Sequence, residues 1–149
     1  MQPLYIFDLD GTIALNEHRQ HFLKKDPMDW DNFYLSCIDD KPNIPVIQTM
    51  KGLSIVGADI KIFSGRGEIA YRLTLAWLIK YNLLDMISTI LMRKENDYTK
   101  DEDLKKQWYN ELSEKDKLRL VAVFEDRAKV VAMWRNIGVA CFQVAEGSF

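Results

Sequence analysis

The chain has 149 residues, of which 48% are hydrophobic and 28% are charged, and its formal net charge is −2. These values indicate one globular domain with a buried core, and they exclude a disordered chain and a membrane-spanning one. Because there is no basic excess, the chain is not expected to bind along a long duplex, and if it acts on a nucleic acid we expect it to bind one terminal phosphate. It has no signal-peptide pattern, and its two cysteines, Cys37 and Cys141, have no metal-binding spacing. We therefore expect a cytoplasmic protein.

Five short apolar segments alternate with longer segments of helical periodicity. The expected strands are Leu4–Leu9, Asp59–Phe63, Thr89–Met92, Leu120–Phe124 and Val139–Gln143. The expected helices are Asn43–Val56, Glu68–Tyr81, Asp101–Leu112 and Lys129–Ile137, with Gly57 and Gly138 as left-handed caps. This alternation predicts an α/β fold with a central parallel sheet flanked by helices. In the second helix, one apolar face is expected to carry Ile69, Leu73, Ala76, Trp77 and Ile79.

The segment from residue 14 to residue 45 departs from this alternation, because it contains no clear strand. It carries basic residues, a possible short helix at Asp29–Cys37 and three aromatic residues, Trp30, Phe33 and Tyr34. It is too short for a second domain, so we expect one domain over residues 1–149 in which residues 14–45 form a small cap or flap. The rings can form the buried face of the short helix, which is their commoner use, or a surface that stacks on a terminal base.

The motif Asp8-Leu9-Asp10-Gly11-Thr12 directly follows the first expected strand. In open α/β sheets, ligands bind beyond the carboxyl ends of the strands. Two carboxylates one residue apart at such an end can both reach a divalent cation such as Mg²⁺. A turn without any ligand is the alternative explanation of this motif taken alone.

The motif Ser64-Gly65-Arg66 follows the second expected strand. The hydroxyl group, the nearby backbone N–H groups and the guanidinium group can together hold a phosphate. A strand-to-helix turn that ends in a solvated arginine would have the same sequence. The position at a strand end is what favours a phosphate site.

Lys105 lies four residues after Asp101 in the third expected helix. Taken alone, this spacing is typical of an intrahelical salt bridge. The functional alternative places Lys105 beside a nucleophile, where its ammonium group would offset the charge of carboxylates and phosphate.

The sequence Glu125-Asp126-Arg127 follows the fourth expected strand and provides a second pair of acids at a strand end. Asp126 could complete a metal site with Asp8. The same acids also suit the N-terminus of the following helix, and the two explanations can hold together.

Taken in order, the four motifs resemble the signature of phosphatases of the haloacid dehalogenase (HAD) superfamily. The resemblance implies a Rossmann-like core and a magnesium-dependent phosphomonoesterase. Asp8 would be the nucleophile that forms an aspartyl-phosphate, Asp10 the general acid and base, and Lys105 a third catalytic residue. The implied metal ligands are Asp8, Asp10, Glu125 and Asp126.

Parts of the C-terminal half resemble more narrowly the phosphatase domain of the phage polynucleotide kinase/phosphatase family. The matching residues are Met92-Arg93, Thr99-Lys100-Asp101, Lys105, Asp126-Arg127, Val130 to Val139 and Cys141 to Phe149. This resemblance implies removal of 3′-terminal phosphates, with 2′,3′-cyclic phosphates as a further class, from nucleic-acid ends or nucleotides. It also implies that Arg19 and Arg93 help Ser64, Gly65 and Arg66 to hold the phosphate. A phage-encoded chain would act in the cytoplasm of its host.

Three features depart from that family. No GxxxxGK[ST] motif occurs, so we expect no 5′-kinase activity. Glu125 replaces an aspartate, which makes Asp126 the stronger candidate for a metal ligand. Residues 14–45 differ in their aromatic and basic residues, and substrate choice would be set there.

Other functions stay open at this point. One is a small-molecule phosphatase that acts on free nucleotides or sugar phosphates, and another is a phosphate-binding domain that has lost catalysis. A receiver-like domain is the weakest alternative, because it would not need Asp10.

Overall fold

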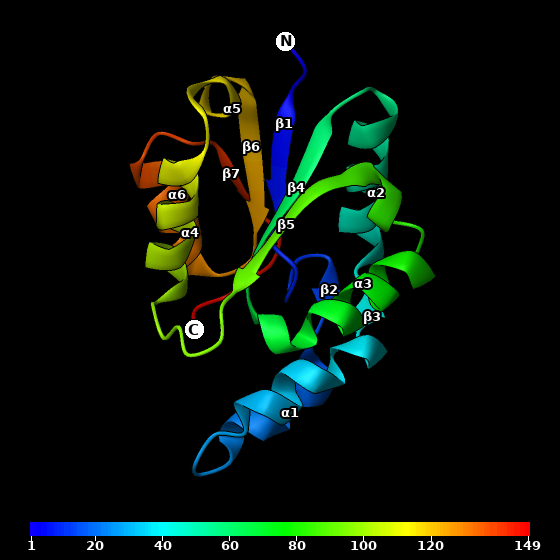
Figure 1. Ribbon diagram of the computed structural model, residues 1–149, viewed down its shortest axis with the longest axis vertical. Coiled ribbons are helices and arrows are strands. Elements are labelled where there is room, and N and C mark those ends of the chain that lie inside the picture. The colour runs from blue at the N-terminus through cyan, green and yellow to red at the C-terminus, as the bar shows by residue number, and fades with distance from the viewer.

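Five parallel strands form the central sheet of the computed structural model, which describes residues 1–149. The strands are β1 (Leu4–Phe7), β4 (Asp59–Gly67), β5 (Ile87–Arg93), β6 (Leu120–Glu125) and β7 (Cys141–Gln143). Their order across the sheet is β5-β4-β1-β6-β7, and each neighbouring pair is parallel. The expected α/β fold is thereby confirmed. Because β1 lies in the middle, the residues that follow it emerge at the centre of the carboxyl edge of the sheet (Figure 1).

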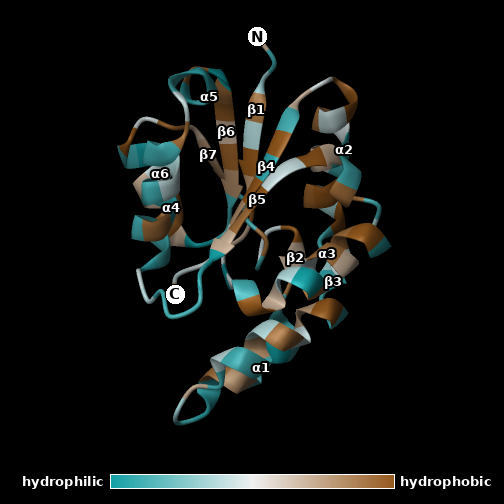
Figure 2. Cartoon of the chain, in the orientation of Figure 1, coloured by the Kyte–Doolittle hydropathy of each residue, from teal (hydrophilic) through white to brown (hydrophobic).

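Helices cover both faces of this sheet (Figure 1). The helices on one face are α2 (Ile44–Ile55) and α3 (Tyr71–Lys80), on the other α4 (Asp101–Glu111) and α6 (Ala128–Asn136); α5 (Glu114–Arg119) leads into β6. Successive residues of β1 supply the two cores, since Phe7 packs with residues of α2 and α3 and Ile6 with residues of α6. Figure 2 shows the apolar residues concentrated on the strands between these layers. None of the helices is both long and apolar enough to cross a membrane.

Residues 14–45 form a separate layer below the carboxyl ends of the strands in Figure 1, and we call this segment the flap. Its elements are β2 (Ala14–Leu15), the 3-10 helix η1 (Glu17–Lys24), α1 (Trp30–Leu35), the 3-10 helix η2 (Ser36–Asp39) and β3 (Lys41–Pro42). β2 and β3 pair antiparallel, with Ala14 opposite Pro42. The flap therefore leaves the core and returns to it at one place.

Most expected elements lie within two or three residues of their expected bounds, and Gly57 and Gly138 have the predicted positive φ angles of 94° and 85°. The apolar face predicted for α3 is wrong in part, because Trp77 is buried and Leu73 half-buried but Ala76 is exposed. Ile69, in the 3-10 turn η3 (Glu68–Ala70) before α3, is exposed, and so is Ile79, whereas the polar residue Thr74 is fully buried. The hydroxyl group of Thr74 accepts a hydrogen bond of 2.9 Å from Arg66, which satisfies the buried oxygen.

Candidate active site

Asp8 lies at the carboxyl end of the central strand and is almost completely buried. Its backbone N–H donates to the carbonyl oxygen of Phe124 at 3.0 Å, which holds the loop after β1 against β6. The Nζ atom of Lys105, from α4, donates to Asp8 Oδ1 at 2.9 Å. The proximity of Lys105 to the candidate nucleophile is therefore as expected.

The intrahelical salt bridge between Asp101 and Lys105 does not form. Lys105 instead donates a second hydrogen bond, of 2.7 Å, to Glu125 Oε2. Asp101 pairs with Arg93 at 2.6 Å and with Arg127 at 3.0 Å. Lys105 is 2% exposed, so its ammonium group is available only to the two carboxylates beside it.

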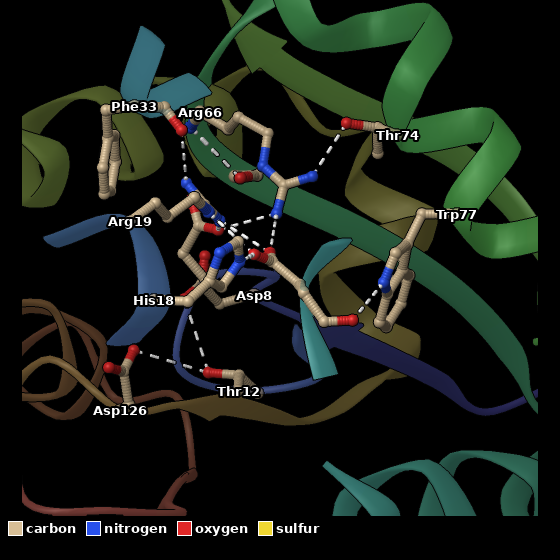
Figure 3. Close-up of polar contacts among 12 residues, drawn as sticks. Asp8, Thr12, His18, Arg19, Phe33, Arg66, Thr74, Trp77 and Asp126 are labelled. Atoms are coloured by element: carbon tan, nitrogen blue, oxygen red, sulfur yellow. Dashed lines mark hydrogen bonds and ion pairs between the residues drawn. The ribbon is translucent and has the colours of Figure 1, made fainter. Parts of the chain in front are cut away.

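Asp8, Glu125 and Asp126 form a buried acidic cluster in which one oxygen of each lies within 4.8 Å of the others. Thr12 Oγ1 lies between two of these acids, 3.4 Å from Asp8 and 3.5 Å from Asp126 (Figure 3). A Cβ atom at Gly11 would lie 2.1 Å from Asp126 Oδ2, and Gly11 has a φ angle of 78°. Only glycine therefore allows the turn after β1 to pass under the Asp126 carboxylate.

Burial and mutual repulsion perturb these acids. Burial, followed by the charge of Glu125, raises the pKa of Asp8 well above its usual value. Burial, followed by the charge of Asp8, raises the pKa of Asp126 to about 7. Three carboxylates thus share a single ammonium group, that of Lys105. When all three are ionised, two negative charges have no cation to offset them.

A divalent cation fits this excess of negative charge, and carboxylate oxygens are the ligands that Mg²⁺ prefers. The Glu125 carboxylate is already occupied, because Oε2 accepts from Lys105 and Oε1 accepts from the amides of Asp126 and Arg127 at 3.1 and 3.3 Å. Asp8 and Asp126 keep oxygens without a strong donor. They are the residues best placed to hold the cation.

Asp10 lies outside this cluster, although both its carboxylate and that of Asp8 were expected at one metal. Its Oδ1 atom accepts from Arg66 Nη2 at 2.6 Å and also from Arg19 Nη2. Burial would raise the pKa of Asp10, but the charges of Arg66 and Arg19 outweigh it and hold the pKa at about 2. Asp10 is therefore ionised and paired with the two arginines that were expected to hold phosphate.

Asp40, at the end of η2, was not identified from the sequence and completes this arrangement. Its carboxylate accepts from Arg19 at 2.8 Å (Nε) and 2.7 Å (Nη2), and from Arg66 Nη2 at 3.3 Å. His18 Nε2 lies 2.7 Å from Oδ1, and the indole of Trp77 donates to the Asp40 carbonyl oxygen at 2.8 Å. Figure 3 shows the side chains of His18, Arg19 and Arg66 converging on one another. No motif or spacing marks Asp40, since its partners lie 21 to 37 residues away.

Ser64, Gly65 and Arg66 lie within β4, which runs to Gly67 instead of ending at Phe63 as predicted. The pairing with β5 is irregular between Ser64 and Gly67, and Arg66 extends from this irregular end of the strand toward Asp10 and Asp40. Ser64 Oγ accepts from the backbone N–H of Arg66 at 3.1 Å, and Arg66 Nε is buried without a partner. A Cβ atom at Gly65 would lie 2.2 Å from Asp101 Oδ1, so this end of the strand passes close to the start of α4.

Arg93 binds backbone carbonyl oxygens and Asp101 rather than the carboxylates of the site. Its guanidinium group donates to the carbonyl oxygens of Gly65 at 2.9 Å, Asp97 at 3.0 Å and Thr99 at 2.6 Å, and to Asp101 at 2.6 Å. These bonds fix the loop between β5 and α4, and Lys105 extends from α4. Contact between Arg93 and a phosphate stays a prediction.

The C-terminal segment closes the other side of the acidic cluster. Gly147 accepts from the backbone N–H of Ala128 at 2.7 Å, and a Cβ atom at Gly147 would lie 2.4 Å from the carbonyl oxygen of Asp126. The side chain of Gln143 donates to the same carbonyl oxygen at 3.2 Å. The backbone of Asp126 is thereby held between β6 and the last residues of the chain.

Known proteins share this arrangement of fold and sequence. A family model described as the polynucleotide kinase PNKP phosphatase domain matches residues 2–149. The inferred bifunctional polynucleotide kinase/RNA ligase of Autographa californica nuclear polyhedrosis virus is 34% identical over 134 residues, which are 89% of this chain and 18% of the viral protein. The chain thus spans less than a fifth of that relative.

Solved structures agree with this match. A chain in the structure of the Pnkp1/Rnl/Hen1 RNA repair complex superposes with a TM-score of 0.81 and 32% identity, covering 99% of this chain and 44% of that one. A haloacid dehalogenase-like hydrolase from Streptococcus pneumoniae superposes with a TM-score of 0.63 at 11% identity, over 95% of this chain and 84% of that one, and supports the fold alone. The chain therefore belongs to the family of polynucleotide kinase PNKP phosphatase domains, which are phosphatases with the HAD fold.

Proposed function

We propose that this domain is a magnesium-dependent phosphomonoesterase that removes 3′-terminal phosphates from nucleic-acid ends or nucleotides, with 2′,3′-cyclic phosphates as a further substrate class. The observation that carries the proposal is the position of Asp8, which is buried between the ammonium group of Lys105 and the free carboxylate of Asp126. The family match over residues 2–149 supports a phosphate ester at a nucleic-acid end as the substrate.

Asp8 is the nucleophile. One of its carboxylate oxygens attacks phosphorus, the bond between phosphorus and the ester oxygen breaks, and an aspartyl-phosphate remains on Asp8. Lys105 holds the carboxylate in place through Oδ1 and offsets its charge, which lowers its repulsion from the phosphate. Mg²⁺ bound by Asp8 and Asp126 would offset the remaining negative charge and polarise the phosphoryl oxygens.

Asp10 transfers protons to and from the oxygens that leave and attack. It gives a proton to the leaving 3′-oxygen in the first step and takes one from the attacking water in the second, which releases inorganic phosphate. Asp10 carries no proton while Arg19 and Arg66 are bound to it. An incoming phosphate competes for the same guanidinium groups, and their shift onto phosphate oxygens raises the pKa of Asp10 and lets it be protonated.

The test is phosphate release from a 3′-phosphorylated oligonucleotide and from a 3′-mononucleotide, with Mg²⁺ and with a chelator. Asp8→Asn removes the nucleophile, and Asp103→Asn, on the exposed side of α4, is the matched control. We expect Mg²⁺-dependent release that Asp8→Asn abolishes and Asp103→Asn preserves. Trapping of labelled phosphate on the wild-type protein, but not on Asp8→Asn, would identify the covalent intermediate.

Each alternative has its own outcome. Faster release from sugar phosphates or free nucleotides than from any 3′-end would favour a small-molecule phosphatase. Binding of inorganic phosphate by a folded protein, without turnover of any ester in Mg²⁺, would favour a domain that has lost catalysis.

A further inference from the structure

The three aromatic residues of α1 lie in different surroundings. Phe33 is 5% exposed, and its ring lies under the guanidinium group of Arg19, 4.5 Å from Cζ. Trp30 packs edge-on against Phe33 with ring centroids 5.8 Å apart, yet it remains 45% exposed. Burial therefore accounts for Phe33 and leaves a face of Trp30 in solvent.

Tyr34 lies over the strand that carries the phosphate motif. A Cβ atom at Gly67 would be 2.9 Å from the ring of Tyr34, so the ring packs directly on the backbone one residue after Arg66. The Tyr34 hydroxyl group makes no hydrogen bond with the chain. Burial raises its pKa, and the charges of Arg93, Asp101 and Asp10 act on it. Tyr34 is half-buried, and its contact with Gly67 places the ring beside the strand segment that carries Arg66.

The rings of Trp30 and Tyr34 are neighbours, with centroids 5.7 Å apart and planes that differ by 33°. The position of this surface relative to the site is fixed by Arg19, whose Nη1 donates to the carbonyl oxygen of Phe33 at 3.1 Å and whose Nη2 pairs with Asp10. The helix that carries the two rings is thus tied to a guanidinium group that an incoming phosphate would bind.

We propose that Trp30 and Tyr34 form the surface on which the base of the terminal nucleotide stacks while its 3′-phosphate lies at Asp8. This inference rests on the function proposed above. A flat aromatic ligand matches two adjacent rings, and stacking tolerates any base because every base has a π-face. The phosphate is then held by the core and the base by the flap. The pair selects nucleotides over phosphate esters that have no aromatic group.

The test compares two substrates that differ only in the terminal base. One is a short 3′-phosphorylated oligonucleotide, and the other carries an abasic sugar at the same 3′-phosphorylated position. Loss of one base–aromatic contact corresponds to roughly a tenfold change in affinity. We therefore expect Trp30→Ala to lower about tenfold the ratio of kcat/KM for the substrate with the base to kcat/KM for the abasic substrate.

Conservative variants separate stacking from a structural effect. Trp30→Phe and Tyr34→Phe keep a ring and should retain most of the preference for the base. Leu35→Ala is the matched control, because Leu35 is also an exposed apolar residue of α1, and it should keep the wild-type ratio. If Trp30→Ala lowers kcat/KM equally for both substrates, or leaves the ratio at its wild-type value, the inference is overturned.

A binding measurement keeps this inference distinct from the proposed catalytic activity. In an Asp8→Asn background, the affinities for the two labelled oligonucleotides are measured by fluorescence anisotropy. Tighter binding of the substrate with the base, lost in Trp30→Ala, supports the stacking surface even if the wild-type protein turns over neither substrate. Equal affinity of the Asp8→Asn protein for both oligonucleotides overturns it, whatever the turnover.

Discussion

The ammonium group of Lys105 donates to the carboxylate of Glu125 at 2.7 Å, joining α4 to the end of β6. This contact explains why a glutamate, with its longer side chain, fits at position 125. One carboxylate oxygen accepts from Lys105 and the other from the backbone N–H of Asp126. In the function proposed above, Glu125 therefore positions Lys105, and Asp126 would hold the metal.

The first prediction separates these two acids. Glu125→Gln leaves Lys105 less firmly held, so kcat should fall roughly ten- to a hundredfold, while the Mg²⁺ concentration for half-maximal activity changes little. Asp126→Asn should instead raise that concentration more than about tenfold, because a metal ligand is lost. Mg²⁺ titrations of initial rates check both, with the exposed Glu114→Gln as control. A large rise in the Mg²⁺ requirement of Glu125→Gln would make Glu125 a ligand as well.

Lys105→Met should both inactivate and destabilise the protein. Asp8 and Glu125 would be left without their shared cation, and removing one member of a buried ionic group costs about 3 kcal/mol. Urea unfolding at pH 8 measures the loss. Lys106→Met, at the exposed neighbouring position, should change the free energy of unfolding by less than about 0.5 kcal/mol. The difference should shrink at pH 5, where the two acids can take up protons.

The stability of the metal-free protein should fall as the pH rises towards neutrality. The pKa of Asp126 is about 7 in the folded protein and 3.8 ordinarily. Between these pH values, the folded state holds a proton that the unfolded state has released, so raising the pH favours unfolding. Mg²⁺ competes with that proton and should raise the melting temperature more at pH 8 than at pH 5.5. Asp10 contributes stability that is lost as the pH falls, but only below about pH 4, because its pKa in the folded protein is about 2.

Calorimetry with and without Mg²⁺ across this range checks the pH prediction. Asp126→Asn should flatten the pH dependence of the metal-free protein. A metal-free protein whose melting temperature rises steadily from pH 5 to pH 8 would contradict the assignment.

Asp40→Asn should uncouple the flap from the core. It removes one of the two carboxylates that offset Arg19 and Arg66, the other being Asp10, and removing one member of a buried ionic group costs about 3 kcal/mol. Limited proteolysis should then cut within residues 14–45 sooner than in the wild-type protein. Asp39→Asn, at the exposed neighbouring position, is the control and should leave both stability and proteolysis as in the wild type. Equal cleavage of the two variants would show that Asp40 does not hold the flap.

Gly11→Ala should weaken the metal site although it replaces none of the metal ligands. The new methyl group would meet Asp126 Oδ2 and would also sit at a φ angle of 78°, which alanine adopts only with strain. We expect a higher Mg²⁺ requirement and a stability loss of about 1 kcal/mol or more. Gly52→Ala, where a Cβ atom would meet nothing, is the control.

The sequence predicted the sheet and the acidic motifs because both depend on local patterns. Apolar runs mark β1, β4 and β6, and each motif is contiguous with one of them. The wrong face of α3 arose because hydrophobicity alone cannot show that Thr74 is buried by a hydrogen bond to Arg66. Asp40 could not be found for a similar reason, since its role depends on the folding of the flap against the core.

The predicted separation of roles within the site was also incomplete. Asp8 and Asp10 are one residue apart, yet their carboxylates turn to different partners, one to Lys105 and one to two arginines. In a strand, residues i and i+2 face the same side, but β1 ends at Phe7, so Asp8 and Asp10 lie in the turn after it, where this alternation no longer holds. Spacing therefore identified the residues but not which of them share a ligand.

The antiparallel pairing of β2 with β3 has a consequence for how such a domain can diversify. Because Ala14 lies opposite Pro42, the two ends of the flap already meet, and replacing the sequence between them adds little loop-closure entropy. A graft between these ends could carry a new specificity onto an unaltered chemical core. Such a graft would keep an electrostatic constraint, since any replacement must return a cation and an anion to the positions of Arg19 and Asp40.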